Sequence, residues 1–165
     1  MKQLPAVVID FLSAQGFVLV SSIDQNGFPH SSCKAIVKID PAGEIYLIDV
    51  YQGVTSDNIG RNQHVSISAV DEHKFIGYCL KGKARKIQDD SIGQEIIKTW
   101  EDNITSRLAK RLLKNLTQGQ GQGHHPEASL PRPKHIIALQ IEQIVDLAPY
   151  HLRKEASHVQ KRESL

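Results

Sequence analysis

Apolar and polar residues alternate along most of this chain with the two-residue period of β-strands. The alternation predicts six strands, at residues 17–23, 29–39, 44–50, 65–70, 75–87 and 135–141. Asn26-Gly27 is a strong hairpin signal between the first two strands, so the chain begins as an antiparallel meander. Apolar strands leave no exposed edge when their sheet closes on itself. We therefore predict a mainly β fold with flanking helices, built on a six-stranded antiparallel barrel.

Two stretches have a helical period instead. Residues 6–12 follow Pro5 and stop before Gly16, which predicts a short helix. Residues 89–116 carry a large apolar side chain at every fourth position. Each step of four overshoots a full turn by ~40°, so one straight helix would wrap this stripe round itself. Because Asn103 is a weak helix former at the midpoint, we predict two helices or one bent helix that breaks near it.

The fifth predicted strand is longer than usual and contains two glycines. Gly77 and Gly82 indicate a bend or a bulge where a barrel closes or a ligand comes close. Residues 145–147 are able to prolong the last strand.

Composition adds limits to this picture. The 165 residues, 40% hydrophobic and 23% charged, suit one globular domain, which we expect at residues 1–148. A Gly-, Gln- and Pro-rich stretch at 118–133 predicts a flexible loop, and 149–165 a polar basic tail. No segment reaches the ~20 apolar residues of a membrane span, and no signal peptide is evident. We expect a cytoplasmic protein in which Cys33 and Cys79 are reduced thiols.

The net charge of +2 gives no reason to expect nucleic acid or a membrane as partner. Aromatic residues make up 5% of the chain, too few for a base-stacking platform. Nor do we expect a metal site: His124 and His125 are adjacent, lack a third ligand and fall in the Gly-Gln loop. Cys33 has no His or Cys partner at motif spacing, so a buried apolar cysteine is favoured over a reactive one.

The stretch that links the third and fourth strands, residues 49–62, is the candidate binding element. Gly53 frees the backbone there, and Thr55 or Ser56 is placed to cap a short helix. A helix start with free N–H groups and two hydroxyls is able to bind an anion. The alternative is an ordinary capped helix with no ligand.

Three segments together carry a family resemblance: Gly27–Lys34, Gly53–Ile59 and Phe75–Ala84. In order and spacing they resemble the FMN-binding split barrel of the pyridoxamine 5′-phosphate oxidase-like proteins, over roughly Pro5 to Leu147. The likeness is closer to small, little-characterised flavin-nucleotide-binding relatives than to the oxidase itself. The oxidase turn carries an Arg-Lys pair where this chain has Val54-Thr55, and its substrate-phosphate residues have no match here. Pyridoxamine 5′-phosphate oxidation is therefore not expected.

The resemblance implies which residues bind FMN. It assigns the phosphate to Lys34, Thr55 and Ser56, and the ring and ribityl chain to the backbone of the second strand. Asn58 would support the turn or the flavin. The implied cofactor-binding residues are Ser32, Cys33, Lys34, Ala35, Gly53, Val54, Thr55, Ser56 and Asn58.

The implied function is an FMN-dependent oxidoreductase that moves electrons between a reduced nicotinamide, or another donor, and a small acceptor. No acid–base pair or nucleophile stands out, so no catalytic residue is assigned, and the flavin would do the chemistry. Three alternatives stay open: a flavin carrier without turnover, and a split barrel that binds a deazaflavin or a haem.

The expected partner is a second copy of the chain. Split barrels of this type pair side by side, so the resemblance implies a homodimer with shared flavin sites. Residues 35–39 and 45–48 also carry aliphatic groups on both faces. Part of the outer barrel surface must then pack on a helix or on a partner.

Overall fold

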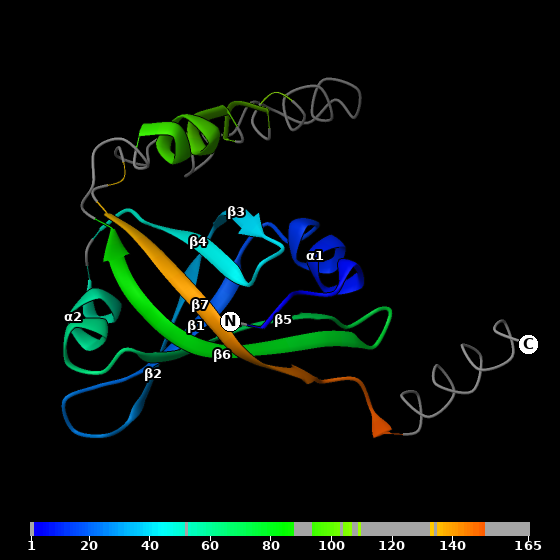
Figure 1. Ribbon diagram of the computed structural model, residues 1–165, viewed down its shortest axis with the longest axis horizontal. Coiled ribbons are helices and arrows are strands. Elements are labelled where there is room, and N and C mark those ends of the chain that lie inside the picture. Colours follow the sequence, from blue (N-terminus) through cyan, green and yellow to red (C-terminus); the bar gives the residue numbers. More distant parts are fainter. Residues whose placement is uncertain are drawn as a thin grey trace, which may run out of the picture.

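The computed structural model describes residues 2–51, 53–87, 94–102, 104–106, 109, 133 and 135–150 (Figure 1). The predicted break near Asn103, the loop at 118–133 apart from Pro133, and the tail from 151 onward lie outside the described residues. Among the helices in the described ranges, none combines the length and the apolarity needed to cross a membrane.

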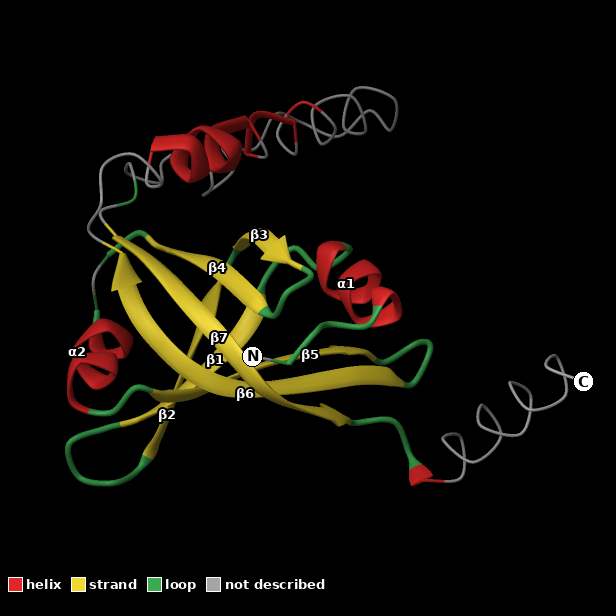
Figure 2. Cartoon of the chain, viewed as in Figure 1, coloured by secondary structure: helices red, strands yellow, loops and turns green. Residues whose placement is uncertain are grey.

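The described strands form one antiparallel sheet (Figure 2). They are β1 (Val18–Ile23), β2 (Pro29–Lys34), β3 (Ile36–Asp40), β4 (Glu44–Asp49), β5 (His64–Asp71), β6 (Ile76–Ile87) and β7 (His135–Asp146). Their order in the sheet is β2-β1-β5-β6-β7-β4-β3. The mainly β, antiparallel barrel architecture is confirmed. The predicted count of six strands is wrong, because the strand expected at 29–39 is divided into β2 and β3.

Ala35 is the point of this division, and it explains why the sheet curls. β2 and β3 are the two edges of the sheet, yet Ala35 alone separates them in the chain. The two edges must therefore lie close together. Ile48 N donates a hydrogen bond of 3.1 Å to Ala35 O, which joins the seam between β2 and β4. The sheet is thus a barrel split along this seam (Figure 2).

β6 and β7 are long strands that cross the barrel side by side (Figure 1). Their register shifts between Lys81 and Gly82, which confirms the predicted irregularity. A Cβ added at Gly82 would lie 1.9 Å from Gln140 O, so only glycine allows this approach of the two backbones. β7 extends to Asp146, beyond the core prediction of 135–141.

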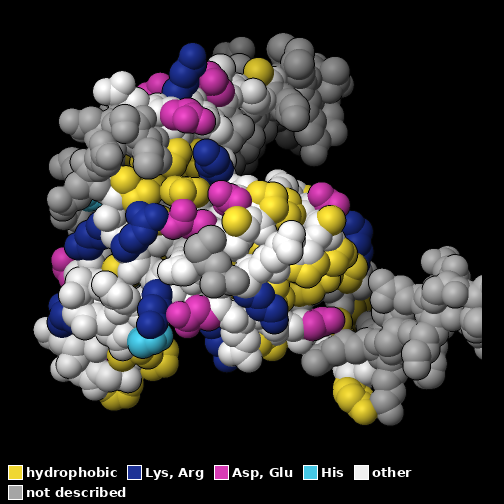
Figure 3. Space-filling model, in the orientation of Figure 1, with side chains coloured by type: hydrophobic (Ala, Val, Ile, Leu, Met, Phe, Trp, Pro, Cys, Tyr) yellow, Lys and Arg dark blue, Asp and Glu magenta, His cyan; other side chains and the backbone are white. Residues whose placement is uncertain are grey.

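Two apolar clusters among the described residues hold the fold together. The first fills the barrel, and helix α1 (Ala6–Ser13) closes one end of it with Val8 and Leu12. The second lies outside the barrel, where the helical residues 94–102 and 104–106, called the outer helix here, cover β4 and β7. Apolar side chains between the outer helix and the sheet are visible in Figure 3. The members of this second cluster are Ile48, Ile87, Ile96, Trp100, Ile104, Ile136 and Ala138.

Candidate functional site

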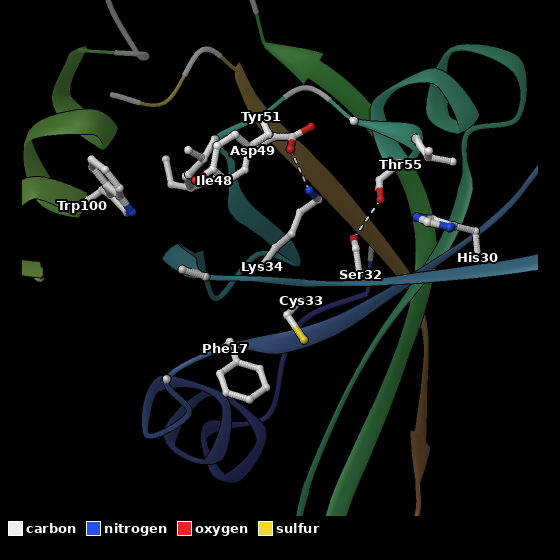
Figure 4. Close-up of a pocket in the computed structure, with 15 residues that line it drawn as sticks. Phe17, His30, Ser32, Cys33, Lys34, Ile48, Asp49, Tyr51, Thr55 and Trp100 are labelled. Atoms are coloured by element: carbon white, nitrogen blue, oxygen red, sulfur yellow. Dashed lines mark hydrogen bonds and ion pairs between the residues drawn. The ribbon is translucent and has the colours of Figure 1, made fainter. Parts of the chain in front are cut away.

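A cavity of about 440 Å³ opens at the split of the barrel, bounded by β2, β4, the start of α2 (Val54–Arg61) and the outer helix (Figure 4). One wall is polar and the other apolar. The polar side chains are His30, Ser32, Lys34, Asp49 and Thr55. The large apolar and aromatic ones are Phe17, Ile48, Val50, Tyr51, Val54 and Trp100. Ligand pockets commonly have about 300–1,000 Å³ and this mixture of apolar surface with a few polar groups.

The alternation of β2 explains its contribution to the polar wall. His30, Ser32 and Lys34 share one half-buried face of the strand, while the residues between them face outward. β4 contributes Asp49, its last residue, and the chain then turns into α2. The site is therefore built where one strand meets the end of another and the start of a helix.

Gly53, not a hydroxyl residue, is the N-cap of α2. It has an extended backbone, and no side chain in the described part of the chain caps the helix. The prediction that Thr55 or Ser56 caps α2 is wrong, because the helix begins at Val54 and both hydroxyls lie within its first turn. The earliest N–H groups of such a helix have no intrahelical acceptor and remain available to an anion.

Thr55 connects α2 to β2. Its Oγ1 lies 2.8 Å from the Oγ of Ser32, within hydrogen-bonding distance (Figure 4). Thr55 is 2% exposed, so this contact is largely shielded from water. It fixes the start of the helix against the strand at the floor of the cavity.

Lys34 and Asp49 form an ion pair in the same wall. The Lys34 Nζ donates to Asp49 Oδ1 over 2.7 Å, and the two side chains are 9% and 3% exposed. Asp49 Oδ2 has no hydrogen-bond partner among the described residues and is shielded from water. No other Asp, Glu, Lys or Arg in the described ranges lines the cavity. Its fixed charges therefore cancel.

Ser56 and Asn58 lie on the buried side of α2 and do not line the cavity. Asn58 Nδ2 donates to Ser22 Oγ over 3.0 Å, and the Arg61 guanidinium donates to Asn58 Oδ1. Ser56 Oγ is buried and lacks a partner within the described structure. These contacts fasten α2 to β1, so Asn58 supports the helix rather than the cavity surface.

The structure brings most of the predicted cofactor-binding residues together. Those that line the cavity are Ser32, Cys33, Lys34, Ala35, Gly53, Val54 and Thr55. Sequence reasoning did not assign Asp49, His30 or Trp100 to the site. The sequence does contain a signal for Asp49. Ile45, Leu47 and Asp49 stand at every second position of one strand, so Asp49 lies on the same inward face as the two buried aliphatic residues.

Other aromatic, cysteine and histidine side chains have structural roles or lie elsewhere. Tyr78 packs edge-on against Phe11, with ring centroids 5.3 Å apart, and belongs to the core. Cys33 is exposed rather than buried, which corrects the expectation of a buried cysteine. Its position in β2 places it on the outward face of that strand. The described residues contain no group of three or more potential metal ligands, and His124 and His125 are outside them.

Comparison with known proteins identifies the family. The family model described as pyridoxamine 5′-phosphate oxidase matches residues 4–148. The chain therefore belongs to this family, which confirms the resemblance derived from the sequence. A search of curated proteins finds no match.

Solved structures share the fold at low sequence identity. HupZ of Group A Streptococcus is 17% identical, with a TM-score of 0.64 over 88% of this chain and 95% of its own. HutZ, the haem storage protein of Vibrio cholerae, is 15% identical, with a TM-score of 0.54 over 87% and 94%. A protein named as an F420 reductase is 12% identical, with a TM-score of 0.55 over 86% and 98%. The fold thus occurs in proteins named for different cofactors.

The cavity fits a flavin-type group on its own features. Trp100 and Ile48 offer apolar surface to a planar ring, and the α2 start offers N–H groups to a phosphate. The unpartnered Asp49 Oδ2 is an acceptor that the described residues leave unused.

Proposed function

We propose that this protein binds FMN in the cavity at the barrel split and uses it to transfer electrons from a reduced nicotinamide, or another donor, to a small acceptor. The observation that supports the proposal is the lining of this cavity. In a chain of this family, it combines the start of a helix, a pair of hydroxyls and apolar side chains. Bound FMN would supply the redox chemistry, as cofactors do in such enzymes. The protein would bind and orient it.

We assign the phosphate to the start of α2, with the hydroxyls of Ser32 and Thr55 beside it. Those hydroxyls are mutual partners at 2.8 Å, and each can also bond a phosphate oxygen. We do not assign Lys34 to the phosphate, because its ammonium is paired with the Asp49 carboxylate at 2.7 Å, and that carboxylate would repel a second anion. This assignment needs no cation at the phosphate and so predicts modest affinity, since charge-assisted bonds are the strong ones.

The apolar wall would hold the ring and exclude water. Ile48 and Trp100 are 3% and 6% exposed, and both belong to the cluster under the outer helix. A ring against them lies in a poorly hydrated environment, where electrostatic contacts are stronger. The outer helix is then part of the binding site as well as a cover for the sheet.

Haem binding is the second candidate function. The fold occurs in HutZ, named as a haem storage protein, and His30 is the one histidine among the described lining residues. A histidine is the usual axial ligand of haem iron. A deazaflavin would use the same site as FMN. We treat deazaflavin binding as a variant of the first proposal, because the fold is shared with a protein named as an F420 reductase.

The visible spectrum of the purified protein, recorded before and after addition of FMN or haemin, tests these proposals. We expect flavin bands and quenched flavin fluorescence. Titration of NADH in air or with dyes then separates an oxidoreductase from a carrier, because a carrier leaves NADH unconsumed. A Soret band without flavin binding would replace the first proposal by the second.

We also propose that the protein is a homodimer. The outward residues of β1 and β2 carry no charge: they are Leu19, Ser21, Ile23, Pro29, Ser31 and Cys33. Exposed strands normally carry charges that prevent association, and interface centres are depleted of them. Phe17 and Val70, 64% and 57% exposed, widen this face. A second copy that covers it would bury these side chains.

A further inference from the structure

The ion pair in the cavity wall restricts which ligand groups can bind beside it more than a neutral polar patch would. Lys34 donates to one oxygen of Asp49 over 2.7 Å, and the other oxygen has no partner among the described residues. A buried acceptor without a donor is unfavourable, so a ligand that supplies one is preferred. The Asp49 side chain is 3% exposed and lines the cavity, which makes the ligand the available source of that donor.

The chemistry of the pair defines the complementary group. An ammonium has three donors, and Asp49 is the one described acceptor for that of Lys34. The wall therefore presents N–H donors beside a carboxylate acceptor. Their complement is a C=O next to an N–H, as on the edge of an amide or imide. A phosphate or a carboxylate has no such N–H and would bring a second negative charge against Asp49.

We propose that Lys34 and Asp49 bind the imide edge of a neutral heteroaromatic ring, such as the pyrimidine part of a flavin or deazaflavin. Asp49 is then a specificity residue that favours these rings over haem, whose polar edge consists of carboxylates. This inference rests on the proposed function and deepens it. The terminal torsion of aspartate is soft, so a rotation of the carboxylate turns the shielded Oδ2 toward the ring N–H.

The test compares two ligands that lack a phosphate: riboflavin and 3-methylriboflavin, in which a methyl group replaces the imide hydrogen. Titration of the full-length protein, followed by flavin fluorescence, should give at least tenfold weaker binding of 3-methylriboflavin. In Asp49→Ala the ratio of the two dissociation constants should fall to within threefold of one. Asp10→Asn, an exposed carboxylate on α1, is the matched control and should keep the wild-type ratio.

Equal binding of both flavins by the unaltered protein overturns the inference, and this comparison needs no variant to fold. An unchanged ratio in a folded Asp49→Ala variant also overturns it. In both cases the proposed function stands, because flavin binds. Binding of haemin with no binding of riboflavin or FMN overturns the inference and the proposed function together.

Discussion

The hydroxyl oxygens of Ser32 and Thr55 lie 2.8 Å apart, across the gap between the middle of β2 and the first turn of α2. These residues are far apart in the sequence, and the contact sets the distance between a strand and a helix start. Because a hydroxyl both donates and accepts, the pair keeps capacity for a ligand oxygen. The same contact therefore stabilises the packing of α2 on β2 and provides hydroxyl groups that can bind an anion.

Replacing Thr55 by Val removes this contact while keeping the side-chain shape. We expect a loss of about 1 kcal/mol in the free energy of unfolding, and FMN binding about tenfold weaker. Riboflavin binding should change less, because it has no phosphate. Urea unfolding and flavin titrations measure these effects. Thr99→Val, on the exposed side of the outer helix, is the control. Equal losses for FMN and riboflavin would contradict the phosphate assignment.

Replacing Lys34 by Met leaves the Asp49 carboxylate buried without its cation. Such a loss typically costs about 3–5 kcal/mol of stability, whereas replacing both partners by apolar residues is often neutral. We expect Lys34→Met to be strongly destabilised and Lys34→Met/Asp49→Leu to recover most of the loss in urea unfolding. Where Lys34→Met remains folded, flavin binding should weaken by about 1.5–3 kcal/mol. Lys38→Met, an exposed lysine on β3, should behave like the parent. A double variant no more stable than Lys34→Met would refute the ion-pair argument.

Gly82 allows the backbones of β6 and β7 to approach, since an added Cβ would lie 1.9 Å from Gln140 O. Gly82→Ala should therefore lower stability by about 3 kcal/mol or prevent folding, at the upper end of overpacking effects. Gly16→Ala provides the comparison, because its Cβ would meet no described atom within 4 Å. We expect its melting temperature to stay close to that of the parent. Similar melting temperatures for both variants would show that the β6–β7 contact adjusts without cost.

Tyr46 should make stability depend on pH in the alkaline range. Its hydroxyl donates to Glu44 Oε2 over 2.6 Å, and this bond, with burial, raises the pKa of Tyr46 to about 12. The folded state thus holds the proton more tightly than the unfolded state, whose tyrosine titrates near 10. The resulting stability is complete below pH 10 and is lost as pH rises from 10 to 12.

Solvent screening reduces this effect to about 1–2 kcal/mol, because the pair is only partly buried. Tyr46→Phe should lack it, so the difference in unfolding free energy between parent and variant should shrink between pH 9.5 and 11.5. Urea unfolding at several pH values measures the difference. A constant difference over that range would contradict a raised pKa of Tyr46 caused by its hydrogen bond to Glu44.

The homodimer can be checked by light scattering at micromolar concentration. We expect twice the mass of the 18.4 kDa chain. Leu19→Lys, a charge at the centre of the uncharged β1–β2 face, should give a monomer, because a lysine buried in an apolar interface is costly. Val7→Lys, an exposed apolar residue on α1, should remain a dimer. A monomeric parent with bound FMN would rule out both the dimer and a shared site.

Strand positions were predictable because the strands have a period-two pattern. β5 extends one residue beyond the prediction at each end, and β6 begins one residue later than predicted. The division of one predicted strand at Ala35 was not predictable, because the alternation of side chains continues through residues 29–39 without interruption. What separates β2 from β3 is the closure of the sheet, which pairs one with β1 and the other with β4. No local pattern contains that information.

The candidate site divides in the same way. Sequence motifs brought Ser32 and Thr55 together through a family resemblance, and the structure agrees on their proximity. The partner of Lys34 was missed, although Asp49 stands at an inward position of its strand. Two inward charges on separate strands become a pair only when the barrel is closed. Ser56 points away from the cavity because the helix begins at Val54, earlier than the hydroxyls suggested.

β7 lies between β6 and β4 in the sheet, although it is the last described strand in the chain. Glu44 pairs with Gln140, so the edge of β4 that faces β7 is covered only after about a hundred further residues have been synthesised. Until β7 has been synthesised, the edges of β4 and β6 that it covers are open, a state prone to aggregation. Pairings over such sequence distances also make folding slow. The arrival of β7 is thus the step that completes the barrel, and any chain that stops before residue 135 cannot form it.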